Sequence, residues 1–142
     1  MAVQGWAPRT KILMHPSTDI SGDITGGFVG HCGWSSSLEA IVFGVPITAM
    51  PIHLDQPLNA KLVVDLGVGV EVWREDGSYK REEVAKAIEL VVVQEGGEQV
   101  RKRAKELSAR IWERQEEEQT SAAMKKLEQV FGDQTTLNLV KL

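Results

Sequence analysis

The sequence predicts an α/β fold, with a Rossmann-like parallel sheet flanked by helices. Short apolar runs of strand length alternate with longer amphipathic runs of helix length, and glycine or proline separates many of them. Short strands separated by such helices are typical of βαβ units and therefore of a parallel sheet. The 142 residues are 42% hydrophobic and 25% charged. This length and composition indicate one ordinary globular domain that can bury a core.

The first half of the chain accounts for most of the predicted sheet. We expect a short helical or turn segment at 12–15, strands at 27–31, 45–50 and 68–72, and helices at 35–43 and 56–66. Gly44 and Gly67 end the two helices, and Pro51 closes the second strand. In the first helix, Leu38, Ile41 and Val42 share a face. In the second, Leu58, Leu62 and Val63 are expected to face inward.

The second half is predicted to be helical after a turn at Asp76-Gly77. One amphipathic helix covers 81–94, with Val84, Ile88 and Val91 or Val92 inward, and Gly96-Gly97 interrupts it. A second helix covers 98–115, and its apolar stripe is Val100, Ala104, Leu107 and Ile111. Thr120 or Ser121 is expected to cap a last helix, and the chain from Gly132 onward to be a tail.

Charge and composition exclude several classes of function. The net charge of −4 offers no basic surface to a nucleic acid. No apolar run approaches the roughly 20 residues of a membrane span, and the N-terminus lacks a signal-peptide pattern. Cys32 is the single cysteine, so an intrachain disulfide is excluded. A lone thiol fits a reducing compartment, and we expect the cytosol.

The residues between the predicted strand at 27–31 and the next helix form the first candidate site. Ligands of parallel sheets bind at the carboxyl ends of strands, beside helix N-termini that attract phosphate. Gly33 permits a tight turn there, and Ser35, Ser36 and Ser37 begin the helix. The serines can contact a phosphate oxygen or only cap the helix. His31 can donate to a diphosphate, serve as a base, or be purely structural.

Three further positions offer groups suited to a nucleotide sugar. Glu39 can accept two hydrogen bonds from ribose hydroxyls, or it is a plain surface residue. Trp6 offers a face for a base, an interaction worth roughly 1–3 kcal/mol, or it belongs to the core. Asp55-Gln56 can bind sugar hydroxyls, and Asp55 can instead cap the following helix.

Several short motifs occur in a fixed order over the first third of the chain: Trp6-Ala7-Pro8, His15-Pro16-Ser17, Gly26-Gly27-Phe28, His31-Cys32-Gly33-Trp34, Glu39, Gly44-Val45-Pro46 and Asp55-Gln56. Together they resemble the nucleotide-sugar box of the plant family 1 UDP-dependent glycosyltransferases. The resemblance implies the C-terminal, donor-binding half of a GT-B fold, with its first strands missing. A partial donor domain would then cover 1–131, followed by a tail at 132–142.

The resemblance also implies a role for each residue of the box. Uracil would be bound by stacking on Trp6 and by the backbone of Ala7 and Arg9. The diphosphate would be bound by His31 and Ser36, near Gly33 and Ser35. Glu39 would bind the ribose. The sugar would be recognised by Trp34, Asp55 and Gln56. A terminal Gln usually accompanies UDP-glucose. Ser35 and the segment 51–56 resemble the branch that extends sugar chains on existing glycosides.

Three departures from the family pattern are visible. Arg9 replaces the usual Gln beside Trp6. Ser35 replaces the commoner Asn, and its shorter side chain shortens one polar contact near the phosphates. About seven extra residues lie within 18–25, where the Gly, Ser and Asp content favours an outward loop that costs little closure entropy. The catalytic His of the family, and the Asp that orients it, have no counterpart here. The resemblance therefore implies no catalytic residue in this chain. Because the first strands of the domain have no counterpart either, we also expect an unfilled sheet edge.

These observations favour the donor-binding part of a UDP-glucosyltransferase acting on a plant metabolite or its glycoside. The resemblance implies an N-terminal GT-B domain in another chain, a UDP-sugar donor, and no metal or other cofactor. The alternative is a non-catalytic module that binds UDP or a UDP-sugar. A hydrolase using Cys32 with His31 is disfavoured, because adjacent residues of a strand point to opposite faces.

Overall fold

The computed structural model describes the backbone of residues 26–140 and the side chains of residues 26–127. The expected helical turn at 12–15, the insertion within 18–25, and Trp6, Ala7 and Arg9 lie outside the described residues. Contacts within the chain divide it into two units, residues 1–109 and residues 110–142, and each is described by itself.

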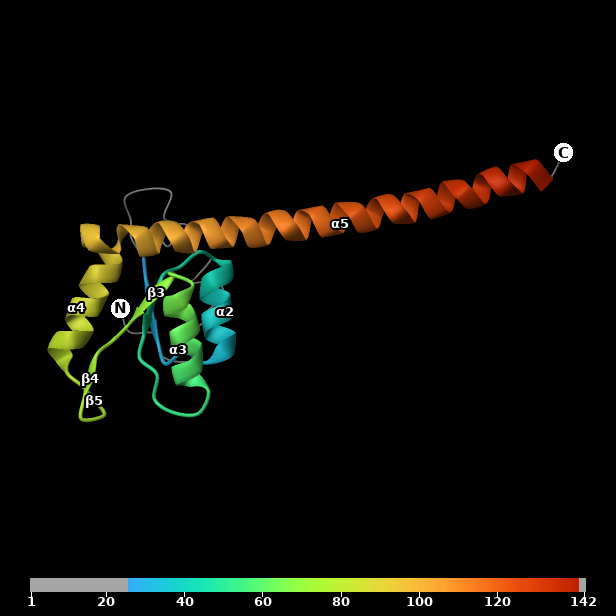
Figure 1. Cartoon of the computed structure of the whole chain (residues 1–142). Coiled ribbons are helices and arrows are strands. Elements are labelled where there is room, and N and C mark those ends of the chain that lie inside the picture. Colours follow the sequence, from blue (N-terminus) through green and yellow to red (C-terminus); the bar gives the residue numbers. More distant parts are fainter. Residues whose placement is uncertain (1–25, 141–142) are drawn as a thin grey trace, which may run out of the picture. The chain divides into compact units, whose positions relative to one another are not determined.

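The first unit alternates strands and helices in the predicted order, which confirms the α/β class (Figure 1). Its elements are β1 (Phe28–Gly30), α2 (Trp34–Val42), β2 (Ile47–Ala49), α3 (Gln56–Asp65), β3 (Gly69–Glu71), β4 (Arg74–Glu75), β5 (Ser78–Tyr79), α4 (Arg81–Val92), the short 3-10 helix η2 (Glu95–Gly97) and the beginning of α5 (Glu98–Val140). Apart from β4, β5 and the far end of α5, helix and strand positions agree with the sequence expectation to within a few residues.

The larger sheet is parallel, as predicted, with the strand order β1-β2-β3. Phe28 of β1 pairs with Ile47 of β2, which pairs in turn with Gly69 of β3. All three residues of β2 are buried. A central parallel strand is covered on both faces, so its sequence is a run of small and apolar residues rather than an alternation.

The inward faces of α2 and α3 differ from the prediction. Leu58 and Leu62 are 72% and 41% exposed, so the expectation that they face inward is wrong, although Val63 is buried. On α2, Leu38 is 43% exposed whereas Ile41 is buried, so the shared apolar face is only partly covered. The buried positions are instead Ser36, Ser37, Ala40 and Ile41 in α2, and Gln56, Asn59, Ala60 and Val63 in α3. Ala40 and Ala60 are fully buried. Small residues let the helices lie close to the sheet, and apolar periodicity alone does not reveal this.

The predicted turn at Asp76-Gly77 is confirmed and joins an antiparallel hairpin, β4–β5, that was not predicted. Both turn residues have positive φ, 50° and 78°. Two left-handed residues in succession match the twist of a two-residue hairpin loop, and Asp-Gly suits them. Two-residue strands are too short to produce a recognisable alternation, so the sequence gives only the turn.

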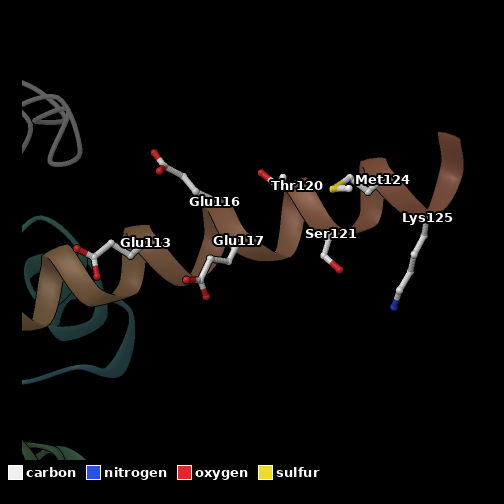
Figure 2. A pocket seen from close by; sticks show the side chains of 7 residues that line it. All are labelled: Glu113, Glu116, Glu117, Thr120, Ser121, Met124 and Lys125. Carbon is white, nitrogen blue, oxygen red and sulfur yellow. The ribbon is translucent and has the colours of Figure 1, made fainter. Parts of the chain in front are cut away.

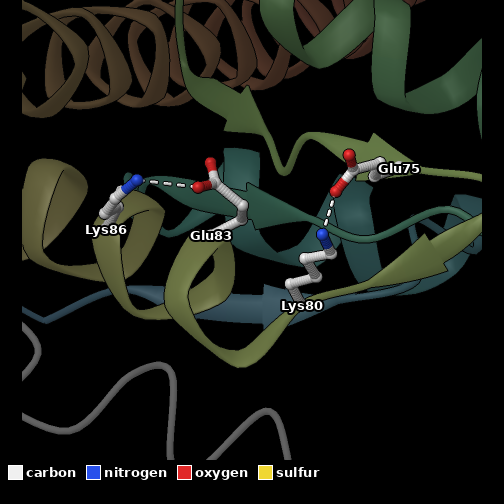
Figure 3. Close-up of polar contacts among 4 residues, drawn as sticks. All are labelled: Glu75, Lys80, Glu83 and Lys86. Atoms are coloured by element: carbon white, nitrogen blue, oxygen red, sulfur yellow. Dashed lines mark hydrogen bonds and ion pairs between the residues drawn. The ribbon is translucent and has the colours of Figure 1, made fainter.

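Two ion pairs lie along the hairpin and the helix that follows it (Figure 3). Lys80 pairs with Glu75, and Lys86 Nζ lies 2.7 Å from Glu83 Oε1, three residues apart on α4. Most of these side chains are largely exposed. Exposed pairs contribute only about 0–1 kcal/mol, so they add little to the stability of this region.

Helix α4 is confirmed, with Val91 fully buried, and the break at Gly96-Gly97 coincides with η2. The expected end of the next helix near Gln115 is wrong, because α5 continues to Val140 and includes the segment expected to be a tail. Residues 116–119 are Glu and Gln, which favour helix, and no proline follows. Thr120 and Ser121 therefore continue the helix instead of capping a new one.

The start of α5 contacts the carboxyl ends of three other helices. Ser108 Oγ donates to the Val42 carbonyl at 2.6 Å, at the end of α2. Arg103 Nε donates to Leu66 O at 3.3 Å after α3, and an Arg101 guanidinium nitrogen donates to Val91 O at 3.0 Å in α4. Such bonds satisfy carbonyls left over at helix ends, where a positive charge is also favoured.

The second unit, residues 110–142, contains the rest of α5. A shallow groove runs along this helix, lined by Glu113, Glu116, Glu117, Thr120, Ser121, Met124 and Lys125 (Figure 2). All of these side chains come from the one helix, and no residue predicted to bind a ligand is among them. Among the helices the structure describes, none is long and apolar enough to cross a bilayer.

Candidate functional site

The candidate site lies where β1 and β2 lead into α2 and α3. The β1–α2 loop is residues 31–33, and the β2–α3 loop is residues 50–55. Both follow the carboxyl ends of adjacent parallel strands, which pair through Gly30 and Ala49. The amino ends of the two helices follow at the same edge of the sheet. This is the edge at which parallel sheets bind ligands.

His31 lies directly beside the amino end of α2. Gly33 is the N-cap residue, and a Cβ placed on it would lie 2.8 Å from His31 Nε2. With glycine at position 33 the imidazole can lie against the helix end, whereas a Cβ there would displace the ring. Gly33 also has no side chain with which to cap the helix, and His31 is exposed. A donor ring next to first-turn amides is an arrangement that suits an anion.

Cys32, between His31 and Gly33, is the buried residue of the β1–α2 loop. Its side chain is 1% exposed, and its φ of 62° is left-handed, which is uncommon for a residue other than glycine. Burial raises the pKa of its thiol; the Ser37 hydroxyl lowers this pKa and the Glu71 carboxylate raises it. A buried thiol of raised pKa is a poor nucleophile, which argues against the hydrolase alternative.

The first turns of α2 present both exposed and buried groups. Trp34 is 54% exposed, whereas Ser36 is 9% exposed and lies on the inner face. Ser35 is exposed, and its Oγ lies 3.4 Å from Glu39 Oε1, one turn further along. Trp34 and Ser35 are thus exposed at the start of α2, and Glu39 is half-buried further along the same helix.

The β2–α3 loop has its own left-handed residue, Leu54, with φ 59° and a side chain 86% exposed. Gln56 organises this loop: its Oε1 accepts from the amides of Ile52 at 2.9 Å and His53 at 3.1 Å. Both acceptor positions of the carboxamide oxygen are thereby used. The Nε2 group, which lies 3.4 Å from His53 Nδ1, is the part of the amide left to a sugar hydroxyl, and the residue is only 8% exposed.

Asn59 connects the two loops, and sequence reasoning missed it. Its Nδ2 donates to the Cys32 carbonyl at 3.0 Å and to Asp55 Oδ2 at 2.9 Å. The expected alternative role of Asp55 as a side-chain cap of α3 is not observed, because the carboxylate bonds to Asn59 instead. Asp55 is itself exposed. The available signal was a polar residue at a buried helical position, four residues after the Asp.

Tyr79 supports the β2–α3 loop from the hairpin and was also missed. Its hydroxyl donates to the Pro51 carbonyl at 2.6 Å. Burial raises the pKa of this phenol, and the Arg74 guanidinium, 5.3 Å from the ring centroid, lowers it. The nearby Glu71 raises the pKa further. The hairpin therefore fixes the start of the loop that carries Asp55.

Six of the predicted site residues lie in the β1–α2 loop or on α2: His31, Gly33, Trp34, Ser35, Ser36 and Glu39. Asn59 connects the Cys32 carbonyl of this loop to Asp55, which directly precedes Gln56 at the start of α3. Within the described residues, no group of three or more His, Cys, Asp and Glu side chains is arranged to hold a metal ion.

Comparison with known proteins identifies the family. A family model described as "UDP-glucoronosyl and UDP-glucosyl transferase" matches residues 1–130. UDP-glucosyltransferase 29 of Panax ginseng is 53% identical over 119 residues, which are 83% of this chain and 25% of that protein. The beta-D-glucosyl crocetin beta-1,6-glucosyltransferase of Gardenia jasminoides is 49% identical over 110 residues, which are 77% of this chain and 23% of that protein. The chain thus spans about a quarter of these relatives.

Solved structures extend the likeness to the fold. The crystal structure of Os79 from O. sativa in complex with UDP matches with a TM-score of 0.64 and 40% identity, over 72% of this chain and 22% of that one. The parallel sheet and its flanking helices are accordingly a fragment of a GT-B fold. The chain belongs to the UDP-glucoronosyl and UDP-glucosyl transferase family.

Proposed function

We propose that this chain is the donor-binding part of a UDP-glucosyltransferase. The observation that carries the proposal is the position of the His31 imidazole beside Gly33, at an amino end of α2 that its N-cap residue does not cover. First-turn amides and the helix dipole favour negative charge there, and the imidazole adds a hydrogen-bond donor. The chemistry of this end of the helix matches a diphosphate.

The rest of the donor is assigned to the neighbouring groups. Glu39 binds the ribose hydroxyls, and Ser36 adds a donor near the diphosphate. Trp34 and Asp55 contact the sugar together with Gln56, whose Nε2 acts as donor because its Oε1 already accepts from Ile52 and His53. Uracil binds to Trp6, Ala7 and Arg9. Glucose is the proposed sugar because a Gln ends the box.

The proposed reaction is transfer of glucose to an acceptor hydroxyl with inversion. A base in a separate chain carrying the N-terminal domain removes the acceptor proton, while His31 and the start of α2 stabilise the departing UDP. Protein dipoles neutralise the diphosphate without a metal. We infer a plant small molecule or its glycoside as acceptor, since the name of the Gardenia jasminoides relative describes transfer to a glucosylated molecule.

The proposal is tested first by binding. Calorimetric titration of the chain with UDP and UDP-glucose should give saturable heats, and adenosine diphosphate should give none, because its purine does not fit a site built for uracil. If UDP produces no binding heat, the proposal is wrong.

Turnover is tested separately by adding a complementary chain. The N-terminal half of the Panax ginseng relative, expressed as its own chain, should produce UDP release from UDP-glucose only when mixed with this chain and an acceptor glycoside. UDP binding with no transfer in any such mixture favours the alternative, a non-catalytic module that binds UDP or a UDP-sugar.

A further inference from the structure

The two loops of the candidate site are held together by one side chain. Asn59 Nδ2 lies 3.0 Å from the Cys32 carbonyl in the β1–α2 loop and 2.9 Å from Asp55 Oδ2 in the β2–α3 loop. The side chain is only 8% exposed. The residues that it connects are 23 positions apart in sequence, and each stands next to a residue assigned to the donor.

The chemistry of the two partners determines which way the amide points. A carbonyl and an ionised carboxylate are acceptors only, so both must face the NH₂ group and not the amide oxygen. An NH₂ group has two protons, and each has one partner here. Among side chains as short as that of Asn59, neither a hydroxyl nor a carboxylate can supply two donors from one atom, whereas an amide can.

Both loops need such support because both contain strained backbone. Cys32 and Leu54 adopt left-handed φ values of 62° and 59°. Residues other than glycine rarely adopt this conformation, and they persist in it only where surrounding contacts fix them. The Cys32 carbonyl is fixed by Asn59, and Asp55, adjacent to Leu54, is fixed by the same nitrogen.

We propose that Asn59 is a positioning residue for the donor, which sets the β1–α2 loop and the Asp55 carboxylate at a fixed separation so that diphosphate and hexose are bound together. This inference rests on the proposed function. Asn59 is buried and acts through Asp55 and through the loop that carries His31. Its contribution should therefore be largest for a ligand that engages both loops, which UDP-glucose does and UDP does not.

The first test measures how much the glucose group adds to affinity, as the ratio of the Kd for UDP to the Kd for UDP-glucose. Asn59→Ala and the near-isosteric Asn59→Asp should each lower this ratio about tenfold, as loss of a hydrogen bond to a charged group implies. Asp55→Ala should lower it similarly, and adding Asn59→Ala to Asp55→Ala should lower it no further. Lys61→Ala, an exposed change on the same helix, should leave it unchanged.

The second test reads the loop without any nucleotide. Cys32 is the only cysteine, so the rate at which an aromatic disulfide reagent labels the chain reports opening of the β1–α2 loop. Asn59→Ala should be labelled about tenfold faster than Ser108→Ala after correction to equal stability, because Ser108 contacts Val42 and not this loop.

The two readouts separate the possible failures. The positioning role is overturned if Asn59→Ala and Ser108→Ala are labelled at equal rates after correction for stability. It is also overturned if a chain that binds UDP-glucose keeps its ratio of Kd values in Asn59→Ala, or if the effects of Asn59→Ala and Asp55→Ala on that ratio add in the double variant. A chain that binds no UDP overturns the proposed function and the donor role of Asn59 with it, while the labelling rates still show whether Asn59 holds the loop.

Discussion

Helices α2 and α3 are built differently at their two ends. At the carboxyl ends, Gly44 and Gly67 have φ values of 68° and 72°, which suit glycine, and α5 donates hydrogen bonds to the carbonyls of Val42 and Leu66. At the amino ends, the N-cap residues Gly33 and Asp55 make no side-chain capping bond. The positive φ values there belong to Cys32 and Leu54.

Within this pair of helices, the carboxyl ends therefore contribute to stability and the amino ends to binding. The carboxyl ends use favourable conformations and satisfied carbonyls, which lower the free energy of the folded state. The amino ends retain strained backbone and amides directed at the ligand edge, and such features concentrate at functional sites. Changes at the carboxyl ends should therefore alter the free energy of unfolding, and changes at the amino ends should alter the affinity for UDP.

The largest effect is expected where α5 meets the carboxyl ends. Ala104 is fully buried on α5, so Ala104→Asp places an unpaired charge there and should lower the free energy of unfolding by about 3–5 kcal/mol. Urea denaturation measures this. Lys102→Asp, at an exposed position of the same helix, should change it little. Equal effects of the two variants would mean that this packing does not stabilise the fold.

The next effect is expected at the amino end of α2. His31→Ala should raise the Kd for UDP by about tenfold to a hundredfold, because it removes a hydrogen bond to a charged group. The imidazole is exposed, so the urea midpoint should not move. Gly33→Ala should weaken UDP binding as well, because its Cβ would displace the ring. Full affinity in both variants would remove His31 from the site.

A smaller effect on stability is expected from Ser108→Ala. The change removes the 2.6 Å bond to the Val42 carbonyl and should lower the free energy of unfolding by about 1 kcal/mol. Calorimetry of UDP binding to the same variant supplies the comparison. If the free energy of UDP binding changed by more than the free energy of unfolding, the division between the two ends would be contradicted.

The smallest effect is a loss of stability in alkaline solution that originates near the amino ends. Burial raises the pKa of Cys32 above its ordinary 9.0 and that of Tyr79 above its ordinary 10.0, so the folded state holds these protons more tightly than the unfolded state. The resulting stability is complete below the unfolded pKa values and is lost as pH rises through the folded ones.

Urea midpoints measured from neutral pH into the alkaline range test this prediction. Cys32→Ala should remove the thiol part of the decline, and Tyr79→Phe the phenol part. A decline that is identical in all three proteins would place its origin elsewhere in the chain.

The sequence predicted the α/β class because glycine and proline separate runs of strand and helix length, and parallel pairing follows from their order. It also predicted that the loop after β1 precedes a helix N-terminus. It did not predict that Leu38, Leu58 and Leu62 face solvent, since helical periodicity identifies apolar positions but not how closely a helix approaches its sheet.

Residues that act through tertiary contacts were not predictable from one sequence. The partners of Asn59 are Asp55, which is local, and the Cys32 carbonyl, which is 27 residues away. The Tyr79 hydroxyl reaches Pro51 across 28 residues. The spacing of Asp55 and Asn59 is visible in the sequence, but neither of the two long-range contacts has a sequence signature. The length of α5 was missed for a different reason, because Thr120 and Ser121 suit a cap and a helix interior alike.

The central claim is that the amino end of α2, with His31 beside Gly33, binds a diphosphate. A crystal structure of the chain with UDP tests it most directly. We predict a phosphate within hydrogen-bonding distance of His31 Nε2 and of the first-turn amides of α2. A phosphate bound at any other element, with this helix end contacting only solvent, would contradict the account.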